Sequence, residues 1–248
     1  MKPVYIVDGA RTPFLKARNA PGPFSAGDLA TAAGRALLVR QPFAAEDLDE
    51  VILGCASPSP DEVNIGRVAA LRMGCGHKVP GWTVMRNCAS GMQALDSAIA
   101  NIHSGRSQLV LAGGVDALSH AALLYSRTMV LWFAKMAMAK TAGQKAALFA
   151  KLSPSALLSP VIGIMKGLTD PMVNLLIGQT AENLAFRFGI TREQMDAYAK
   201  ESTARAVNAS RSGLFVDEIA PVTVAGRKGD EVVKDDETPF TVNVEKIP

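Results

Sequence analysis

The sequence has few cysteines and no long uninterrupted apolar run, which argues against a disulfide-rich secreted protein and a membrane-spanning one. Its three cysteines are odd in number and lack the spacing of a disulfide framework, so we expect reduced thiols and a cytoplasmic or mitochondrial-matrix location. No apolar run reaches the length that a transmembrane helix needs. The first ten residues read as a strand with polar flanks, so no signal peptide is expected.

Charge is nearly balanced, with 26 Lys and Arg against 23 Asp and Glu and a net charge of +3. This excess is too small to indicate a nucleic-acid partner, but it is compatible with one local cationic patch for a polyanionic ligand. The 248 residues suffice for one large domain or two small ones, and the hydrophobic fraction of 48% is ordinary for a globular protein.

Strand and helix patterns alternate over residues 1–118. Short apolar runs predict strands at 4–7, 51–54, 82–85 and 108–112. Asp28 and Asn64 are expected to cap the starts of two helices, Gly74 to end the second, and Gly113 to end the last strand. The alternation predicts an α/β layer with a largely parallel sheet covered on both faces. Ligands of such sheets bind near the carboxyl ends of the strands.

Cys88 follows one of these strands and precedes a helical pattern that continues to His103. A helix N-terminus offers free N–H groups and the positive end of the helix dipole, which favour the nucleophilic thiolate form. A buried and inert cysteine is the alternative, because cysteine is among the most buried residue types. The residues alone leave both interpretations open.

Five segments, in chain order, resemble the thiolase family, whose members exchange acyl groups between a cysteine and coenzyme A. The segment around the cysteine reads Arg-Asn-Cys-Ala-Ser-Gly-Met-Gln-Ala at 86–94. The others are Arg-Thr-Pro-Phe at 11–14, Leu-Ala-Gly-Gly-Val-Asp-Ala-Leu-Ser at 111–119, Gly-Gln-Thr-Ala-Glu-Asn at 178–183 and Val-Ala-Gly-Arg-Lys-Gly-Asp at 224–230. The resemblance implies a thiolase-like α/β half with a mixed sheet at 1–118 and a mostly helical loop domain at 119–248.

The resemblance also assigns roles. Cys88 matches the nucleophile that carries the acyl thioester, and its backbone N–H matches one oxyanion donor. Coenzyme A is then a co-substrate, with no permanently bound cofactor and no metal. Arg227 matches the loop-domain arginine that faces the nucleotide end of coenzyme A, where a guanidinium suits a phosphate. A solvated basic turn is the alternative for Arg227.

Three family segments have no counterpart here: the Gly-His-Pro histidine, the Cys-x-Gly-x-Gly cysteine and the Asn-Glu-Ala-Phe segment. His77, His103 and His120 stand in other contexts and are expected to be ordinary surface or core residues, as are Cys55 and Cys75. We therefore expect the chain to correspond to the first half and loop domain of a thiolase, as a fragment or a split gene. It would be catalytically incomplete alone.

A long insert at 126–173, together with Leu176-Ile177 in place of the family's His-Met, resembles the β-subunit type of thiolase in trifunctional fatty-acid oxidation complexes. That type implies a 3-ketoacyl-CoA thiolase that forms homodimers or tetramers and uses an α-subunit partner. A short-chain acetoacetyl-CoA thiolase is the alternative enzyme. A non-catalytic fragment that binds an α-subunit or a membrane surface is the alternative of another class.

Residues 121–176 are rich in Met, Leu, Ala and spaced lysines. They could form an amphipathic helix for a membrane surface or a partner, or else a lid over the acyl site or a dimer interface. Further along, helices are expected at 180–188 and after the capping box of Thr191 and Gln194, with Met195 and Tyr198 inward. A strand at 219–224 and an unpatterned tail at 235–248 complete the prediction.

Overall fold

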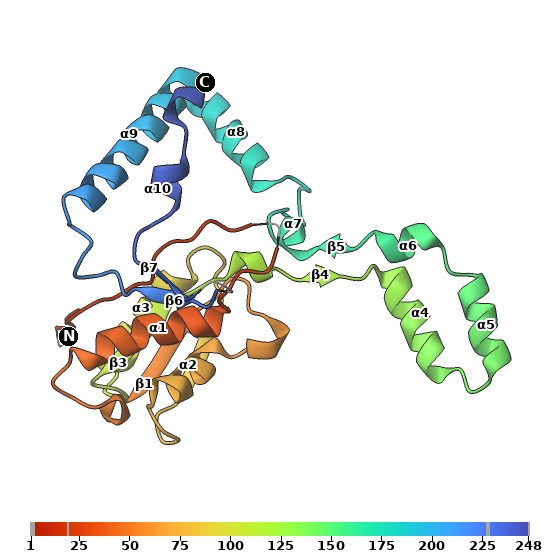
Figure 1. Ribbon diagram of the computed structural model, residues 1–248, viewed down its shortest axis with the longest axis horizontal. Helices are drawn as coiled ribbons and strands as arrows, with labels where there is room; N and C mark the ends of the chain where they lie inside the picture. The colour runs from red at the N-terminus through yellow and green to blue at the C-terminus, as the bar shows by residue number, and fades with distance from the viewer. Residues whose placement is uncertain (1–2, 19, 227–228, 248) are drawn as a thin grey trace. The chain divides into compact units, whose positions relative to one another are not determined.

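The computed structural model describes residues 3–18, 20–226 and 229–247. The chain forms two compact units, Met1–His120 with Ile190–Pro248, and Ala121–Gly189 (Figure 1). The expected domains 1–118 and 119–248 do not coincide with these two units, because residues 190–248 group with the first unit. The division into domains therefore stays a prediction. The first unit holds α1 (Ala26–Val39), η1 (Ala45–Asp47), β1 (Glu50–Gly54), η2 (Pro60–Glu62), α2 (Ile65–Met73), β2 (Gly81–Val84), α3 (Ser90–His103), β3 (Val110–Gly114), η3 (Leu118–His120), α9 (Arg192–Arg211), β6 (Val222–Val224), β7 (Glu231–Val233), α10 (Thr238–Thr241) and η4 (Val244–Lys246).

A parallel three-stranded sheet in the order β2-β1-β3 is the centre of the first unit. Ile52 of β1 lies opposite Trp82 of β2 and Ala112 of β3. All five residues of β1 are buried, as a central strand of a doubly covered sheet requires. The predicted α/β fold is confirmed. The last predicted strand lies two residues further on, because Gly113 and Gly114 continue the pairing with β1 instead of ending it.

The two faces of β1 contact different helices, since successive side chains of a strand point to opposite faces. Val51 and Leu53 pack with buried residues of α1 and α2. Ile52 packs with Ala94 and Ala98 of α3. The first unit is therefore a three-layer α/β/α arrangement.

The helix ends follow local sequence signals, with one correction. Asn64 caps α2 by accepting a hydrogen bond from the Arg67 N–H, and Gly74 ends it at a φ of 91°, both as predicted. The cap of α1 is Ser25, whose side chain accepts from the Asp28 N–H, and the prediction of Asp28 as cap is wrong. Asp28 is the third residue of the helix, and its carboxylate accepts the Ser25 N–H in a capping box.

The predicted strand at 4–7 is not formed in the described structure. Tyr5, Ile6 and Val7 are 77%, 84% and 76% exposed and extended, without a paired strand among the described residues. A hollow of about 750 Å³ lies between this segment, α3 and the free edge of β3. A strand forms only when a neighbouring strand accepts and donates its backbone hydrogen bonds. Here the hollow separates residues 4–7 from β3, so the segment has no such partner in the part of the chain that the structure describes.

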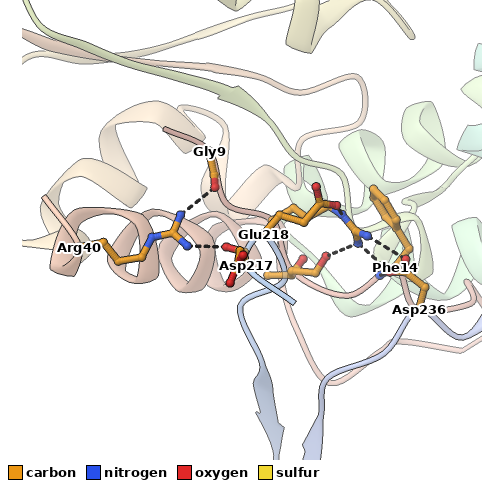
Figure 2. A network of polar contacts seen from close by, with 8 residues as sticks. Gly9, Phe14, Arg40, Asp217, Glu218 and Asp236 are labelled. Atoms are coloured by element: carbon orange, nitrogen blue, oxygen red, sulfur yellow. Dashed lines mark hydrogen bonds and ion pairs between the residues drawn. The ribbon is translucent and has the colours of Figure 1, made fainter. Parts of the chain in front are cut away.

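The residues that follow are held by a polar network to the far end of the chain (Figure 2). The Arg11 guanidinium donates two hydrogen bonds to the Asp236 carboxylate, at 2.7 and 2.9 Å, and one to Glu218 at 2.7 Å. Arg40 donates to the backbone oxygens of Gly9 and Asp217. Burial alone would raise the pKa of Asp236, but Arg11 and the Phe14 N–H hold it below its usual value.

The main regular element in the rest of the first unit is the 20-residue helix α9, and the short β6, β7, α10 and η4 follow it. The capping box of Thr191 and Gln194 opens α9 as predicted. Met195 and Tyr198 are 37% and 74% exposed, so their predicted inward direction is wrong. Helix α9 is strongly polar and contacts the short helix α10. That short helix lies in the tail that looked unpatterned.

The second unit consists of short helices and one small antiparallel pair of strands (Figure 1). Trp132 contacts Phe133 and Phe149 edge to face, with ring centroids 5.2 Å apart in each pair, and its indole N–H donates to the Leu148 carbonyl at 2.9 Å. Among the described residues, no helix is both long and apolar enough to cross a membrane. The elements are β4 (Leu123–Leu124), α4 (Arg127–Met138), α5 (Ala142–Ala150), α6 (Pro154–Leu158), β5 (Val161–Ile162), α7 (Gly163–Gly167) and α8 (Ile177–Phe188).

Candidate active site

Cys88 lies in the turn between the carboxyl end of β2 and the start of α3, as predicted. The strand ends at Val84 and the helix begins at Ser90 after Ala89 as its N-cap. The cysteine is exposed, so the alternative of a buried structural thiol is wrong. Among the described residues, the Cys88 N–H has no protein acceptor, which leaves it free to donate to a bound oxygen.

The turn that carries Cys88 is fixed by its own residues. Asn87 has a φ of 50°, in the left-handed region that asparagine tolerates better than most side chains. The buried Ser90 hydroxyl donates to the Asn87 carbonyl at 2.6 Å and accepts the Arg86 N–H at 2.8 Å. Ser90 therefore holds both sides of the turn. This role could not be predicted from sequence, because the two bonds depend on how the turn folds back on the Ser90 hydroxyl.

Glycines let the start of α3 approach the ends of the neighbouring strands. A Cβ on Gly54 would lie 2.2 Å from the Ser90 backbone carbon, and one on Gly114 would lie 2.9 Å from the Gly91 Cα. Neither contact is tolerable, so both strands must end in glycine where they pass beneath the turn. The carboxyl ends of β1, β2 and β3 thus meet at one edge, where Cys88 is exposed.

A carboxylate that the sequence analysis did not single out organises the rest of this edge. Asp116 follows β3 and accepts the N–H groups of Ala56 and Ser57 at 3.1 and 2.8 Å. Its oxygen also lies 3.4 Å from the Cys55 sulfur. These bonds tie the loop after β1 to the loop after β3, two segments that flank the turn of Cys88.

The three thiols differ in access, because Cys55 and Cys75 are buried and Cys88 is exposed. Burial, together with the Asp116 charge, raises the pKa of the Cys55 thiol to about 12. Burial, together with the Glu46 charge, also raises the pKa of Cys75. Both stay protonated at neutral pH, and both are buried. Cys55 and Cys75 are therefore unreactive thiols without a catalytic role, as the sequence predicted.

Limiting iodoacetamide should therefore label Cys88 first. Mass spectrometry of tryptic peptides would show carbamidomethyl at Cys88 while Cys55 and Cys75 stay unmodified, because only the exposed thiol can reach the reagent. The Cys88→Ala chain should resist labelling under the same conditions. Preferential modification of either buried cysteine in the folded chain would contradict the assignment.

The histidines described below do not lie against Cys88. His120 uses its Nε2 on the Gly22 carbonyl at 3.0 Å, and His103 ends α3 on the side away from the turn. Among the described residues, no side chain makes a hydrogen bond with Cys88. Groups of three or more potential metal ligands are also not found in the described part of the chain. Arg227 lies outside the described residues.

This fold and the position of Cys88 agree with the known proteins that the chain resembles. The thiolase N-terminal domain family covers residues 4–248. A beta-ketoadipyl-CoA thiolase of Pseudomonas aeruginosa is 37% identical over 95% of this chain and 55% of its own length. The crystal structure of the Bacillus anthracis acetyl-CoA acetyltransferase superposes with a TM-score of 0.78 at 32% identity, over 96% of this chain and 55% of that one. The structure of human mitochondrial 3-ketoacyl-CoA thiolase in complex with CoA gives a TM-score of 0.75 at 29% identity, with the same coverage.

The chain thus spans about half the length of the relatives that it matches. Within that half, the match includes the strands of the sheet, the turn of Cys88 and the segments that follow the second unit. The chain belongs to the thiolase N-terminal domain family.

Proposed function

We propose that the protein transfers acyl groups between Cys88 and coenzyme A, in the thiolysis of a 3-ketoacyl-CoA or the reverse condensation. The observation that carries the proposal is an exposed cysteine at a strand-to-helix turn, on the carboxyl edge of a parallel sheet, in a member of the thiolase family. Coenzyme A serves as co-substrate, and the residues supply binding and nucleophilic chemistry without a resident cofactor.

The chemistry has two steps. The Cys88 thiolate attacks the 3-keto carbon, the bond between carbons 2 and 3 breaks, and acetyl-CoA leaves after its carbanion takes a proton. The thiol of a second coenzyme A then loses a proton and attacks the acyl thioester, which regenerates Cys88. Negative charge develops on a carbonyl oxygen in both steps, and the Cys88 N–H is a donor without a competing protein acceptor.

The base and acid for these proton transfers are proposed to come from residues beyond the matched half. Arg227 is proposed to contact a phosphate of coenzyme A, since Arg227 and Lys228 are two adjacent cations in the sequence. The whole protein is proposed to act as a homodimer or tetramer, with an α-subunit as further partner. An odd number of cysteines, three, without the spacing of a disulfide framework supports a reducing compartment.

The insert at 126–173 favours a longer-chain, degradative 3-ketoacyl-CoA substrate, and a short-chain acetoacetyl-CoA thiolase is the second candidate. The named relatives span beta-ketoadipyl-CoA thiolases and acetyl-CoA acetyltransferases, which differ in acyl group. A non-catalytic interaction fragment is the candidate of another class. Retention of an α-subunit by this chain, in a preparation without thiolysis, would favour that third candidate.

A fusion protein tests the proposal. This chain replaces the matched part of the Pseudomonas aeruginosa relative, so that the remaining part of that enzyme follows residue 248. Thiolysis of 3-ketoacyl-CoA substrates of increasing chain length should be measurable and should disappear in the Cys88→Ala fusion. The Cys75→Ala fusion is the matched control and should keep its activity, because Cys75 is buried away from the site. Turnover that survives Cys88→Ala would refute the proposal.

A further inference from the structure

Positive charge is concentrated in one part of the second unit. Residues 121–169 contain six of the chain's 26 Lys and Arg and none of its 23 Asp and Glu, so the rest of the chain carries a net charge of −3. The cations are Arg127, Lys135, Lys140, Lys145, Lys151 and Lys166. A segment of this length without one acidic residue is suited to an anionic surface.

Helix α4 presents apolar side chains among these cations. One side of the helix, with Met129 and Trp132, packs inside the unit, and Met129 is fully buried. On the other side Val130, Leu131 and Met138 are 55%, 52% and 79% exposed. Because residues four apart share a helix face, Val130 and Met138 stand in one row and Arg127, Leu131 and Lys135 in the next.

The hairpin of α4 and α5 adds a shallow hollow of about 420 Å³. Two cations, Lys135 and Lys151, line it together with the apolar Met138, Ala147 and Leu148. Helix α5 also exposes Phe149 next to Trp132, at the end of the row that begins with Lys145. The hollow thus combines ammonium groups for a phosphate with an apolar wall for the adjoining hydrocarbon.

We propose that this cationic hairpin, residues 127–151, binds the surface of a membrane that contains anionic phospholipids. Helix α4 would lie in the plane of the surface, with Val130, Leu131 and Met138 among the acyl chains and the lysines at the phosphates. Interleaved apolar and basic side chains favour lipid over a nucleic acid, which offers no apolar layer. Acidic residues would oppose contact, and the hairpin has none.

Vesicle flotation tests the proposal, because it separates lipid-bound protein from aggregates. The 248-residue chain is mixed with vesicles of pure phosphatidylcholine, or of phosphatidylcholine with one third phosphatidylglycerol. Flotation is expected only with the second, and it should weaken at high salt. Each cation near such a surface contributes about fivefold to binding, so Lys135→Gln with Lys151→Gln should lower the partition constant about 25-fold. Val130→Ser with Leu131→Ser should lower it too.

The matched control is Lys200→Gln with Lys246→Gln, which removes the same charge from exposed positions outside the hairpin and should float like the unaltered chain. Circular dichroism confirms that each variant folds. Equal flotation on both vesicle types, or equal loss in the two lysine pairs, would overturn the proposal. So would capture of an acidic protein subunit through Lys135 and Lys151 by a chain that does not float.

Discussion

Alone, the 248-residue chain should thiolyse acetoacetyl-CoA at least about 10²-fold more slowly than the fusion described above. A single general acid–base group contributes roughly 10²–10⁴-fold, and an oxyanion donor roughly 10²–10³-fold. No described side chain makes a hydrogen bond with Cys88, and the nitrogen of His120 that faces Gly22 is already engaged. The two factors act in one unit and are not multiplied.

The assay needs high enzyme concentration and a control for association. The hollow beside β3 and the exposed Tyr5, Ile6 and Val7 leave apolar surface and a free strand edge, which favour self-association. Size-exclusion chromatography of the assayed sample distinguishes inactivity from aggregation. Cys88-dependent turnover by the isolated chain, whether monomer or oligomer, would mean that the base lies within these residues. Our view of where the acid and base reside would then be wrong.

The second large effect concerns stability: Glu50→Ala should lower the free energy of unfolding by about 3 kcal/mol or more. Glu50 begins β1, at the opposite end of the strand from the Cys88 edge, and is 5% exposed. Its carboxylate accepts hydrogen bonds from the Trp82 indole at 3.0 Å, the Asn101 amide at 2.6 Å and the Ser107 hydroxyl at 2.7 Å. Removing it leaves three donors from three segments without their acceptor.

Urea unfolding followed by circular dichroism measures this change. Glu231→Ala is the control, since Glu231 also begins a strand but is exposed, and it should change stability by about 0.5 kcal/mol or less. Glu50→Gln should fall between them, because the amide keeps one acceptor oxygen and turns a donor toward Trp82. A Glu50→Ala chain as stable as the control would show that water or repacking replaces these bonds.

The same carboxylate makes stability depend on pH. Burial alone would raise the pKa of Glu50, but bonds from Trp82, Ser107 and Asn101, with the Arg106 charge, hold it below its ordinary 4.5. A group with a depressed folded pKa stabilises the fold above its unfolded value and loses that contribution as pH falls through the folded one. As the pH falls below about 4.5, the urea concentration at the midpoint of unfolding should therefore decrease. This decrease should be steeper for the unaltered chain than for Glu50→Gln.

Local signals predicted the parts of the fold that local physics decides. The buried run of β1, the Asn64 cap and the glycine that ends α2 follow from burial, side-chain capping and left-handed φ. The position of Cys88 followed from a strand pattern that meets a helix pattern. In the segment around Ser25, two residues of one capping box both qualify as a cap, and only the backbone angles separate them.

What escaped prediction depends on partners far away in the chain. The segment at 4–7 has strand composition, but a strand also needs a neighbour. Asp116 and Glu50 each collect donors from several loops, and no spacing rule brings those loops together. The direction of Tyr198 is set by tertiary contacts that a weakly amphipathic helix does not encode. The family resemblance supplied the role proposed for Cys88, which composition alone could not.

The polar network around Arg11 has a consequence for how the chain is made. Arg11 pairs its backbone with Glu218 and Ala220, and its side chain with Glu218 across 207 residues. A ribosome that adds roughly 5–20 residues per second needs about 10–40 s to deliver those partners. During that interval the neighbouring Asp8 and Gly9 can already bind Gln41 and Arg40, whereas Arg11 still lacks both of its acidic partners. The side-chain bonds of Arg11 therefore form only after Glu218 and Asp236 have both been added, late in the synthesis of this stretch.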